Sequence, residues 1–467
     1  MLLRESPGSS AQRTCSEMLL NVCAALDEAG IDWCVLHGYA TYPEDVDPDD
    51  VDLMVRPEHF PEVPRVLARL PGVRLVHFRT HDGGTSTRYD VVSQTPEGIP
   101  VILGLDVASE IRDLGIRLLS PEEFLAGRRR FKERLWIPPP SIEFGHYLLK
   151  KLGKSAWFGR DALDGEHEAC LSALFAEDPE GCRRQLARFF PKAEAALIAQ
   201  AAHHRRWETV RSQLDTLRRA AARKTRLAHP QNLLRYWAGD VTRGIRRVLQ
   251  PPGLMVAFLG LDGSGKSAVI ARTMEALGIF FSSAKRYHLR PSLGAHGGDD
   301  TPGLEYEPAR GPILSLAKLG LWWTDYWLGY ALDIFPRLVR STLVLFDRYY
   351  DDLLVDPQRY RFGGPLWLAR MVARYLPRPE LVILLDGPPE LLRARKHGAD
   401  FDDATRQRGA YVSLVRGLRG GHVVDASRPL DEVAAAVQQI IQRHLSARTA
   451  QRLRLTPPWT PSRSARS

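Results

Sequence analysis

The sequence predicts an α/β protein whose C-terminal half contains a parallel sheet, preceded by an α+β region and a mostly helical region. The 467 residues are about three times the commonest domain size, so two or three domains are expected. The composition, with 44% apolar and 25% charged residues, is that of a globular protein. Short apolar runs alternate with helical patterns in both halves of the chain, as they do in α/β proteins.

The first region, residues 1–137, is expected to be an α+β domain. Apolar runs predict strands over residues 33–37, 51–55, 73–78 and 101–107, and helical patterns cover 17–29 and 61–70. A run of prolines from Pro138 to Pro140 then indicates a domain edge. Up to residue 127 the region has 10 Lys and Arg against 21 Asp and Glu, so it is strongly acidic.

The middle region, residues 138–250, is expected to be mostly helical. Residues 191–224 are rich in Ala, Leu, Arg and Glu at helical spacing and contain few strand formers. Residues 128–250 have 25 Lys and Arg against 13 Asp and Glu. This basic region either packs on or steers the acidic one, or it meets nucleic acid or an anionic membrane surface. Because its Arg residues are interleaved with Glu and Asp, a solvated helical face is favoured over a nucleic-acid partner.

The third region, residues 251–447, begins at the turn Pro251-Pro252-Gly253. Apolar strands are expected at residues 254–259, 343–346 and 381–385, and the long helical segments between them are those that a parallel sheet requires. Residues 448–467, rich in Pro, Ser and Arg from Thr456 on, are expected to form a disordered tail.

Three features of the sequence indicate the cellular compartment of the protein. The five cysteines contain no CxxC pair, which argues against a disulfide framework or a zinc ribbon. The N-terminus lacks the apolar core of a signal peptide. The most apolar window, residues 312–335, is interrupted by Lys318, Asp325 and Asp333, which predicts a buried helix rather than a membrane span. A cytoplasmic protein is therefore expected, and its oligomeric state stays open.

A glycine-rich loop directly after the strand at residues 254–259 is the sharpest motif. Its glycines let backbone N–H groups turn toward phosphate oxygens, and the following helix adds the positive end of its dipole. In such loops the lysine reaches the outer phosphates of ATP and the last hydroxyl is a ligand for Mg²⁺. The loop residues are Gly260, Asp262, Gly263, Ser264, Gly265, Lys266 and Ser267.

Together with other segments in the same order, this loop resembles the thymidylate kinase family of nucleoside monophosphate kinases over about residues 253–445. The other segments are the triplet Asp347-Arg348-Tyr349 at a strand end, PELVILLDGPPE at 379–390, the basic RARK at 393–396 and HVVDAS at 422–427. The resemblance implies a P-loop parallel sheet of the nucleoside monophosphate kinase type. It also implies the use of ATP and Mg²⁺ and a phosphorylated small-molecule acceptor, thymidylate by default.

The resemblance also implies a role for individual residues. Lys266 and Ser267 would hold the ATP phosphates and Mg²⁺, and Asp347 would act on Mg²⁺ and its waters. Arg348 would clamp the acceptor phosphate, and Asp262 would contact the acceptor's sugar. These assignments suit a transition state that spreads negative charge over phosphoryl oxygens.

The loop itself contains no arginine, so a lid arginine is expected to supply further positive charge. The resemblance places Arg393, Arg395 and Lys396 in or near that lid. Arg406 and Arg408 are further candidates, or else they are solvated charges of a helix.

The sequence departs from the family's pattern where the acceptor pocket is expected. An acidic segment with Asp351, Asp352 and Asp356 follows the triplet, and three arginines lie nearby in the sequence or on the expected acceptor side: Arg290, Arg359 and Arg361. These arginines either bind an acceptor phosphate or form structural salt bridges with the three aspartates.

Three aspartates in the acidic region form a second pattern. Asp50 and Asp52 are two residues apart on an expected strand, so both carboxylates point to one face, and Asp106 ends a later strand. Three such acids can hold two Mg²⁺ ions for attack on a nucleotide α-phosphate. Residues 15–130 resemble the nucleotidyltransferase fold of the polymerase-β type, although Gly38-Tyr39 replaces the usual Gly-Ser pair. The domain is therefore either active or a silent, substrate-binding or structural one.

Three functional hypotheses follow. The first is ATP-dependent phosphoryl transfer to a nucleoside monophosphate or a similar phosphorylated small molecule. The second is nucleotidyl transfer by the N-terminal domain, with the P-loop domain supplying or sensing nucleotide. The third is a non-catalytic protein that responds to nucleotide.

Overall fold

The computed structural model describes residues 9–113, 116–228, 231–291, 308–388 and 401–455. The chain forms two compact units. The N-terminal unit comprises Met1–Ile245 together with Leu445–Ser467, and the C-terminal unit comprises Arg246–His444. Among the described residues, no helix has both the length and the hydropathy needed to cross a bilayer.

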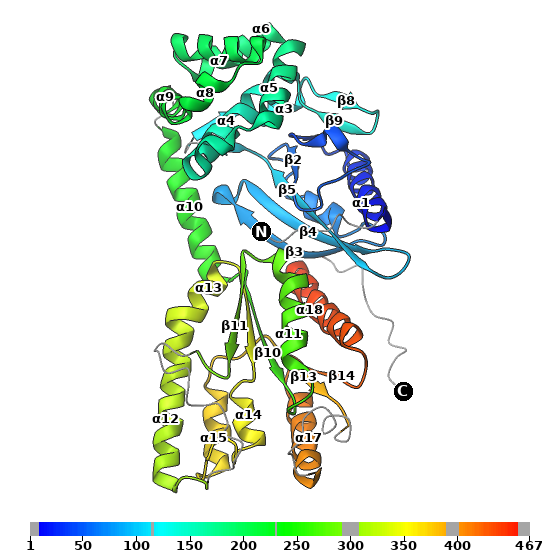
Figure 1. Ribbon diagram of the computed structural model, residues 1–467, viewed down its shortest axis with the longest axis vertical. Coiled ribbons are helices and arrows are strands. Elements are labelled where there is room, and N and C mark those ends of the chain that lie inside the picture. The colour runs from blue at the N-terminus through cyan, green and yellow to red at the C-terminus, as the bar shows by residue number, and fades with distance from the viewer. Residues whose placement is uncertain (1–8, 114–115, 229–230, 292–307, 389–400, 456–467) are drawn as a thin grey trace. The chain divides into compact units, whose positions relative to one another are not determined.

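A five-stranded sheet forms the centre of the N-terminal unit (Figure 1). Its strand order is β1-β2-β5-β4-β3; β2 and β5 run parallel and the other neighbours are antiparallel. The strands are β1 (Trp33–Val35), β2 (Val51–Val55), β3 (Arg74–His81), β4 (Ser86–Gln94) and β5 (Pro100–Ala108). Strand β4 was not predicted, because Arg88 and Asp90 break its apolar pattern and instead pair with each other in the interior.

The two faces of this sheet have different partners. Alternate residues such as Val51, Leu53 and Leu105 pack in one core with helices α1 (Ser9–Glu28) and α2 (Val63–Leu67). The opposite residues, including Cys34 and Met54, join a second core with the helical region. Because side chains alternate along a strand, Asp52 shares the face of Met54 and so lies on the helical side.

The helical middle region belongs to the N-terminal unit. Pro139 is the N-cap of α4 and Pro140 its first residue, so the proline run starts a helix. Among the described residues, two short hairpins and α3 lie between β5 and the middle region, which itself contains seven helices. They are β6 (Ile111–Asp113), β7 (Ile116–Leu119), α3 (Pro121–Leu125), β8 (Arg129–Phe131), β9 (Leu135–Ile137), α4 (Pro140–Phe158), α5 (Gly165–Glu177), α6 (Pro179–Phe189), α7 (Lys192–His204), α8 (Glu208–Ser212), α9 (Leu214–Ala228) and α10 (Gln231–Leu249).

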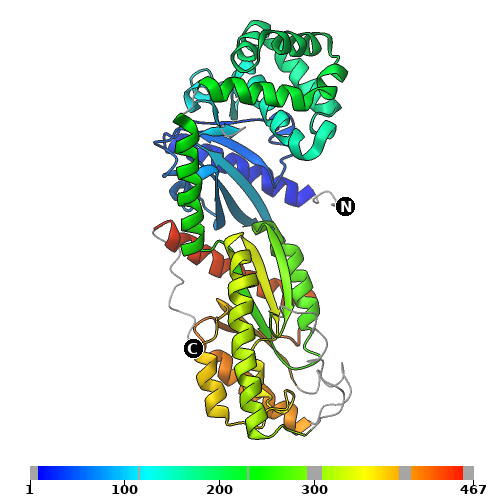
Figure 2. The same ribbon diagram turned by 90° about the vertical axis from the view of Figure 1, so that its left-hand side faces the viewer.

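The C-terminal unit contains the expected parallel sheet, whose strands are coloured from green to orange in Figure 2. Its strand order is β11-β12-β10-β13-β14. The central strands β10 (Leu254–Leu259), β12 (Thr342–Asp347) and β13 (Leu381–Asp386) are almost entirely buried, which explains their unbroken apolar runs. The remaining elements are α11 (Lys266–Leu277), β11 (Ser283–His288), α12 (Pro312–Gly329), a π-helix (Tyr330–Ile334), α13 (Phe335–Val339), α14 (Asp351–Val355), α15 (Leu366–Arg374), α17 (Phe401–Arg416), β14 (Gly421–Asp425) and α18 (Leu430–Arg452).

Helix α12 corrects the prediction of a buried helix over residues 312–335. Trp322 and Tyr326 lie in the core of the unit, but Ile313, Leu321 and Trp327 are 82%, 66% and 41% exposed. The helix packs through a single stripe, so the apolar residues on its other sides stay in contact with solvent.

Helix α18 extends to Arg452, past the point where a disordered tail was expected to begin at residue 448. From Leu445 on, its residues belong to the N-terminal unit. Ser446 Oγ donates a hydrogen bond to the Leu75 carbonyl at 2.9 Å, and Thr449 Oγ1 donates to the Val76 carbonyl at 3.0 Å. This helix end is therefore fastened to strand β3. Residues 456–467 of the expected tail lie outside the described residues.

Candidate functional site

The glycine-rich loop connects the buried strand β10 to helix α11, which begins at Lys266. Gly260, Gly263 and Gly265 have φ angles of 144°, 85° and 82°, which side chains other than glycine rarely adopt. A Cβ at Gly260 would also lie 2.6 Å from the carbonyl oxygen of Leu385. The glycines thus allow the turn that places the loop at the N-terminal end of a helix, where anions are favoured.

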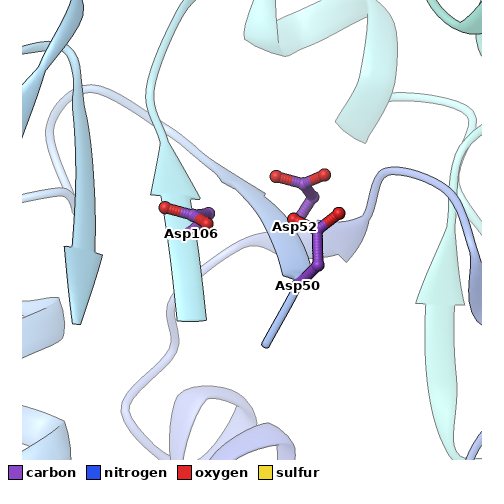
Figure 3. Close-up of side chains that lie close together, drawn as sticks. All are labelled: Asp50, Asp52 and Asp106. Atoms are coloured by element: carbon purple, nitrogen blue, oxygen red, sulfur yellow. The ribbon is translucent and has the colours of Figure 1, made fainter. Parts of the chain in front are cut away.

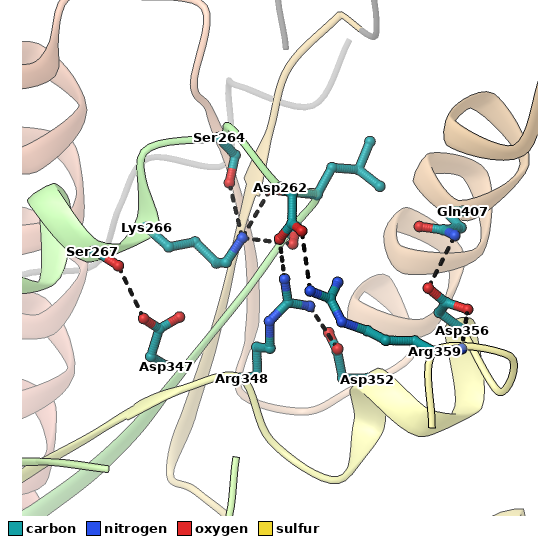
Figure 4. Close-up of polar contacts among 12 residues, drawn as sticks. Asp262, Ser264, Lys266, Ser267, Asp347, Arg348, Asp352, Asp356, Arg359 and Gln407 are labelled. Carbon is teal, nitrogen blue, oxygen red and sulfur yellow. Dashed lines mark hydrogen bonds and ion pairs between the residues drawn. The ribbon is translucent and has the colours of Figure 1, made fainter. Parts of the chain in front are cut away.

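Lys266 is buried within the loop. Its ammonium donates to the carbonyl oxygens of Gly260 and Leu261, both at 2.8 Å, and lies 3.4 Å from Ser264 Oγ (Figure 4). Burial, together with the nearby positive charge of Arg348, lowers the pKa of Lys266 to about 8. A phosphate group would compensate this desolvated charge.

The predicted metal ligands Ser267 and Asp347 meet at the start of α11. Ser267 Oγ donates to Asp347 Oδ2 at 3.1 Å, although the two residues come from different elements (Figure 4). A guanidinium nitrogen of Arg286 lies 2.8 Å from Ser267 Oγ and forms an ion pair with Asp347. The site therefore already attracts a cation, and its hydroxyl and carboxylate oxygens are the donors that Mg²⁺ prefers.

Arg348 and Arg359 converge on the carboxylate of Asp262 (Figure 4). The Arg348 guanidinium bonds to Oδ1, and the Arg359 guanidinium lies 3.0 Å from Oδ2. Burial alone would raise the pKa of Asp262, but the two arginines outweigh it and hold that pKa well below its ordinary value. Two guanidinium groups around one anionic group make a suitable receptor for a phosphate.

A buried carboxylate fixes the direction of Arg348. Asp352 is fully buried in α14 and accepts hydrogen bonds from Arg348 at 2.7 Å, from Tyr360 at 2.6 Å and from Tyr411. The backbone of Arg348 has a φ of 72°, and its N–H donates to the Phe258 carbonyl at 2.9 Å. A strained residue with so many constraints is typical of a functional site.

The other arginines considered from the sequence lie in different surroundings. Arg290 pairs with Asp325, and Arg361 donates to the Pro308 carbonyl at 3.3 Å. Arg406 pairs with Asp403 of its own helix, and Arg408 forms a bidentate pair with Asp386 at 2.7 and 2.8 Å. Of the acids, Asp351 pairs with Arg378, and Asp356 accepts from Gln407 at 3.1 Å and from the backbone N–H of Arg359. Arg393, Arg395 and Lys396 lie outside the described residues.

The acidic cluster of the N-terminal unit is also assembled. Asp50 immediately precedes β2, and Asp52 is the register partner of Asp106 on the parallel strand β5. One carboxylate oxygen from each of the three lies within 4.8 Å of the others (Figure 3). Burial raises the pKa of Asp106 to about 6. This donor set suits a hard divalent cation.

Basic groups surround this cluster. Lys150 Nζ of α4 lies 2.8 Å from Asp52 Oδ2 and 2.5 Å from His37 Nε2. Burial alone would raise the pKa of Asp52, but His37 and Lys150 offset it and hold that pKa below its ordinary value. Arg88 lies 3.3 Å from Asp106 Oδ2 and also bonds to Asp90.

Sequence reasoning missed the residues that reach a site from distant elements. Arg286 was not among the predicted site residues, although it lies on β11 only four residues before Arg290, which was considered for the acceptor side. Lys150 gave no local signal, because its partners His37 and Asp52 lie far away in the chain. Asp352 was noted in the acidic segment four residues after Arg348, but its contact with the distant Tyr411 could not be read from the sequence.

Comparisons with known proteins identify a family for part of the chain. No family model matches the chain. It is 30% identical over 213 residues to the thymidylate kinase of Xanthomonas euvesicatoria pv. vesicatoria (strain 85-10), covering 43% of this chain and 88% of that protein. It is 31% identical over 211 residues to the thymidylate kinase of Xanthomonas oryzae pv. oryzae (strain PXO99A), with the same coverage. It is 28% identical over 215 residues to a probable thymidylate kinase of Pyrobaculum calidifontis, covering 42% of this chain and 98% of that protein. By the motifs, the parallel sheet and these relatives, the chain belongs to the thymidylate kinase family through this part of its length.

Proposed function

We propose that the C-terminal unit transfers the γ-phosphoryl group of ATP to a nucleoside monophosphate, thymidylate by default, or to a similar phosphorylated small molecule. One observation supports this most directly. Ser267 of the loop bonds to Asp347 close to the buried Lys266, while the guanidinium groups of Arg348 and Arg359 converge on Asp262. This arrangement supports one receptor for the donor phosphate and a separate one for the acceptor phosphate.

In the proposed reaction, the backbone N–H groups of the loop and Lys266 bind the outer phosphates of ATP and neutralise their charge. Arg348 and Arg359 orient the acceptor phosphate, whose oxygen attacks the γ-phosphorus as the bond to the β-phosphate oxygen breaks. Mg²⁺, held by Ser267 and Asp347, would supply further positive charge to the transferring group. Arg286 must then release Asp347 and can turn toward phosphate.

The acceptor is the finer part of the proposal. The thymidylate kinases supply thymidylate as the default, but Asp352 and Arg359 belong to the segment where this chain departs from the family's pattern. A panel of nucleoside monophosphates and sugar phosphates should therefore be compared by acceptor-dependent ADP formation. Lys266→Ala should abolish turnover, whereas the control Lys285→Ala, at an exposed position outside the site, should leave it unchanged. Tight ATP binding without turnover on any acceptor would instead favour a nucleotide-responsive binding protein.

We propose a second candidate function for the N-terminal unit, namely nucleotidyl transfer with release of pyrophosphate. The convergence of Asp50, Asp52 and Asp106 supports it. Two divalent ions on these carboxylates would activate the attacking oxygen and stabilise the leaving pyrophosphate. Asp50→Asn and Asp52→Asn should abolish metal-dependent pyrophosphate release and leave acceptor-dependent ADP formation intact. Pyrophosphate release that survives both substitutions would contradict this function.

A further inference from the structure

A side-chain nitrogen from strand β11 bonds to both oxygen atoms that would bind a metal ion in the C-terminal unit. Nη2 of Arg286 donates to Ser267 Oγ at 2.8 Å and also to Asp347 Oδ2. The two oxygen atoms are themselves 3.1 Å apart (Figure 4). Adjacent ligands of an octahedral Mg²⁺ ion, each about 2.1 Å from the metal, lie about 3.0 Å from each other. The spacing of the two oxygens therefore suits one divalent cation, and Arg286 already bonds to both.

Arg286 and a divalent cation cannot both use this pair of oxygens. Asp347 is only 5% exposed, and among the residues that the structure describes it is the only carboxylate that forms an ion pair with Arg286. A cation that binds these oxygens must break this ion pair, because two positive groups at such close range repel each other strongly. A metal ion alone should therefore bind more weakly than the two oxygens by themselves would allow.

Arg286 is placed so that its side chain can leave the pair. Strand β11 is an edge strand of the sheet, and 38% of the Arg286 side chain is exposed, so the guanidinium can turn without disturbing the core. Ser267 belongs to the loop for which we propose triphosphate binding, and a guanidinium binds phosphate oxygens through paired hydrogen bonds. A polyphosphate on this loop would thus give Arg286 a new anionic partner in exchange for Asp347.

We propose that Arg286 competes with the divalent cation for Ser267 and Asp347, so that the site disfavours a metal ion alone and accepts one that arrives with a nucleoside triphosphate. When the nucleotide binds, Arg286 moves to its phosphate oxygens and the cation takes the place of the guanidinium. The proposal rests on the phosphoryl transfer proposed for the C-terminal unit. It adds a residue that determines specificity for the complex of metal and nucleotide.

The test measures Mn²⁺ binding to the full chain by electron paramagnetic resonance. Every protein carries Asp50→Asn and Asp52→Asn, so that the acidic cluster of the N-terminal unit does not contribute. Without nucleotide, Arg286→Gln should lower the dissociation constant for Mn²⁺ about tenfold, because it removes a charged hydrogen-bonded competitor. Lys285→Gln, the matched control, removes the same charge from the next position of β11, on the other side of the strand, and should change nothing. Adding Asp347→Asn to Arg286→Gln should abolish the gain.

ATP binding should change in the opposite direction. In the presence of EDTA, calorimetry should show that Arg286→Gln raises the dissociation constant for ATP about tenfold, because a guanidinium contact to phosphate is lost. A folding defect would weaken the binding of both ligands, so the opposite signs identify the competition. Parent-like Mn²⁺ affinity in Arg286→Gln, an equal gain in Lys285→Gln, or an unchanged affinity for ATP would overturn the proposal.

Turnover distinguishes this proposal from the function on which it rests. If no acceptor supports ADP formation but Arg286→Gln shows both opposite changes in binding, phosphoryl transfer is contradicted and the competition is supported. If the chain transfers phosphate to an acceptor and Arg286→Gln keeps the parent dissociation constants for Mn²⁺ and ATP, phosphoryl transfer stands and the competition is overturned.

Discussion

The buried carboxylate of Asp352 offers a stringent test of the proposed acceptor site. Asp352→Asn keeps the size of the side chain but removes its charge and turns one hydrogen-bond acceptor into a donor. That donor would then face the guanidinium of Arg348 or a hydroxyl group of Tyr360 or Tyr411, all of which bond to the carboxylate in the parent.

The size of the effect follows from the burial. Asp352 is fully buried and the Arg348 side chain is only 5% exposed, so solvent does little to screen their ion pair. Removing one partner of such a pair costs about 3–5 kcal/mol, and we expect a loss of about 3 kcal/mol in the stability of the C-terminal unit. Although burial opposes it, Arg348 holds the pKa of Asp352 below its ordinary value. The stabilisation is therefore complete above the unfolded-state pKa and is lost as the pH falls through the folded-state pKa, so parent and variant should converge in acid.

Hydrogen exchange is the appropriate assay, because a chain of two units need not unfold in one step. Amides of β10 and β12 should lose about a hundredfold in protection if they open with the whole unit. The KM for the acceptor should rise while the KM for ATP changes little, because Arg348 loses its fixed direction. Asp351→Asn is the matched control, since its partner Arg378 is 35% exposed and, in the described structure, forms no hydrogen bond or ion pair with the loop. Parent-like protection together with a parent-like acceptor KM in Asp352→Asn would refute the reasoning.

Three further predictions concern the two sites. Gly260→Ala should abolish ATP binding measured by calorimetry, because its Cβ would meet a backbone carbonyl at 2.6 Å, whereas Gly278→Ala meets nothing within 4 Å and should be neutral. Since the pKa of Lys266 is about 8, its ammonium loses its charge as the pH rises. The dissociation constant for ATP should therefore increase about tenfold between pH 7 and pH 9. An equal increase in Lys266→Arg would show that deprotonation of Lys266 is not the cause. Gly104→Ala would place a Cβ 2.1 Å from the guanidinium of Arg88 and should weaken Mn²⁺ binding to the N-terminal cluster, and parent-like binding would show that Arg88 does not position Asp106.

The parts of the fold that the sequence predicted are those with a local cause. Strands β10, β12 and β13 are buried on both faces, and each appears as a continuous apolar run. Strand β4 was missed because Arg88 and Asp90 are buried as an ion pair, and no local sequence pattern indicates such a pair. The burial of α12 was overestimated because apolar residues cover several of its sides, whereas its residues in the core, such as Trp322 and Tyr326, lie along one stripe.

The contacts of the candidate site likewise fall into those that local motifs predicted and those that they did not. The loop and the triplet at Asp347 are contiguous motifs, and the structure brings them together through the hydrogen bond between Ser267 and Asp347. The contacts of Arg286 with Asp347, of Arg359 with Asp262 and of Asp352 with Tyr411 join segments that are distant in sequence, so they depend on the packing of the sheet and its helices. The catalytic roles of all these residues, and the nucleotidyltransferase character of the first region, stay predictions.

The attachment of α18 to β3 has a consequence for how the protein is made. Residues Leu445 onward complete a unit whose other residues end at Ile245, so the whole kinase-like segment is translated before the first fold has all its parts. A nascent chain released early would leave strand β3 without these partners. The N-terminal unit can therefore complete its fold only after the C-terminal unit has been synthesised. The order in which the two units emerge from the ribosome then affects the yield of folded protein.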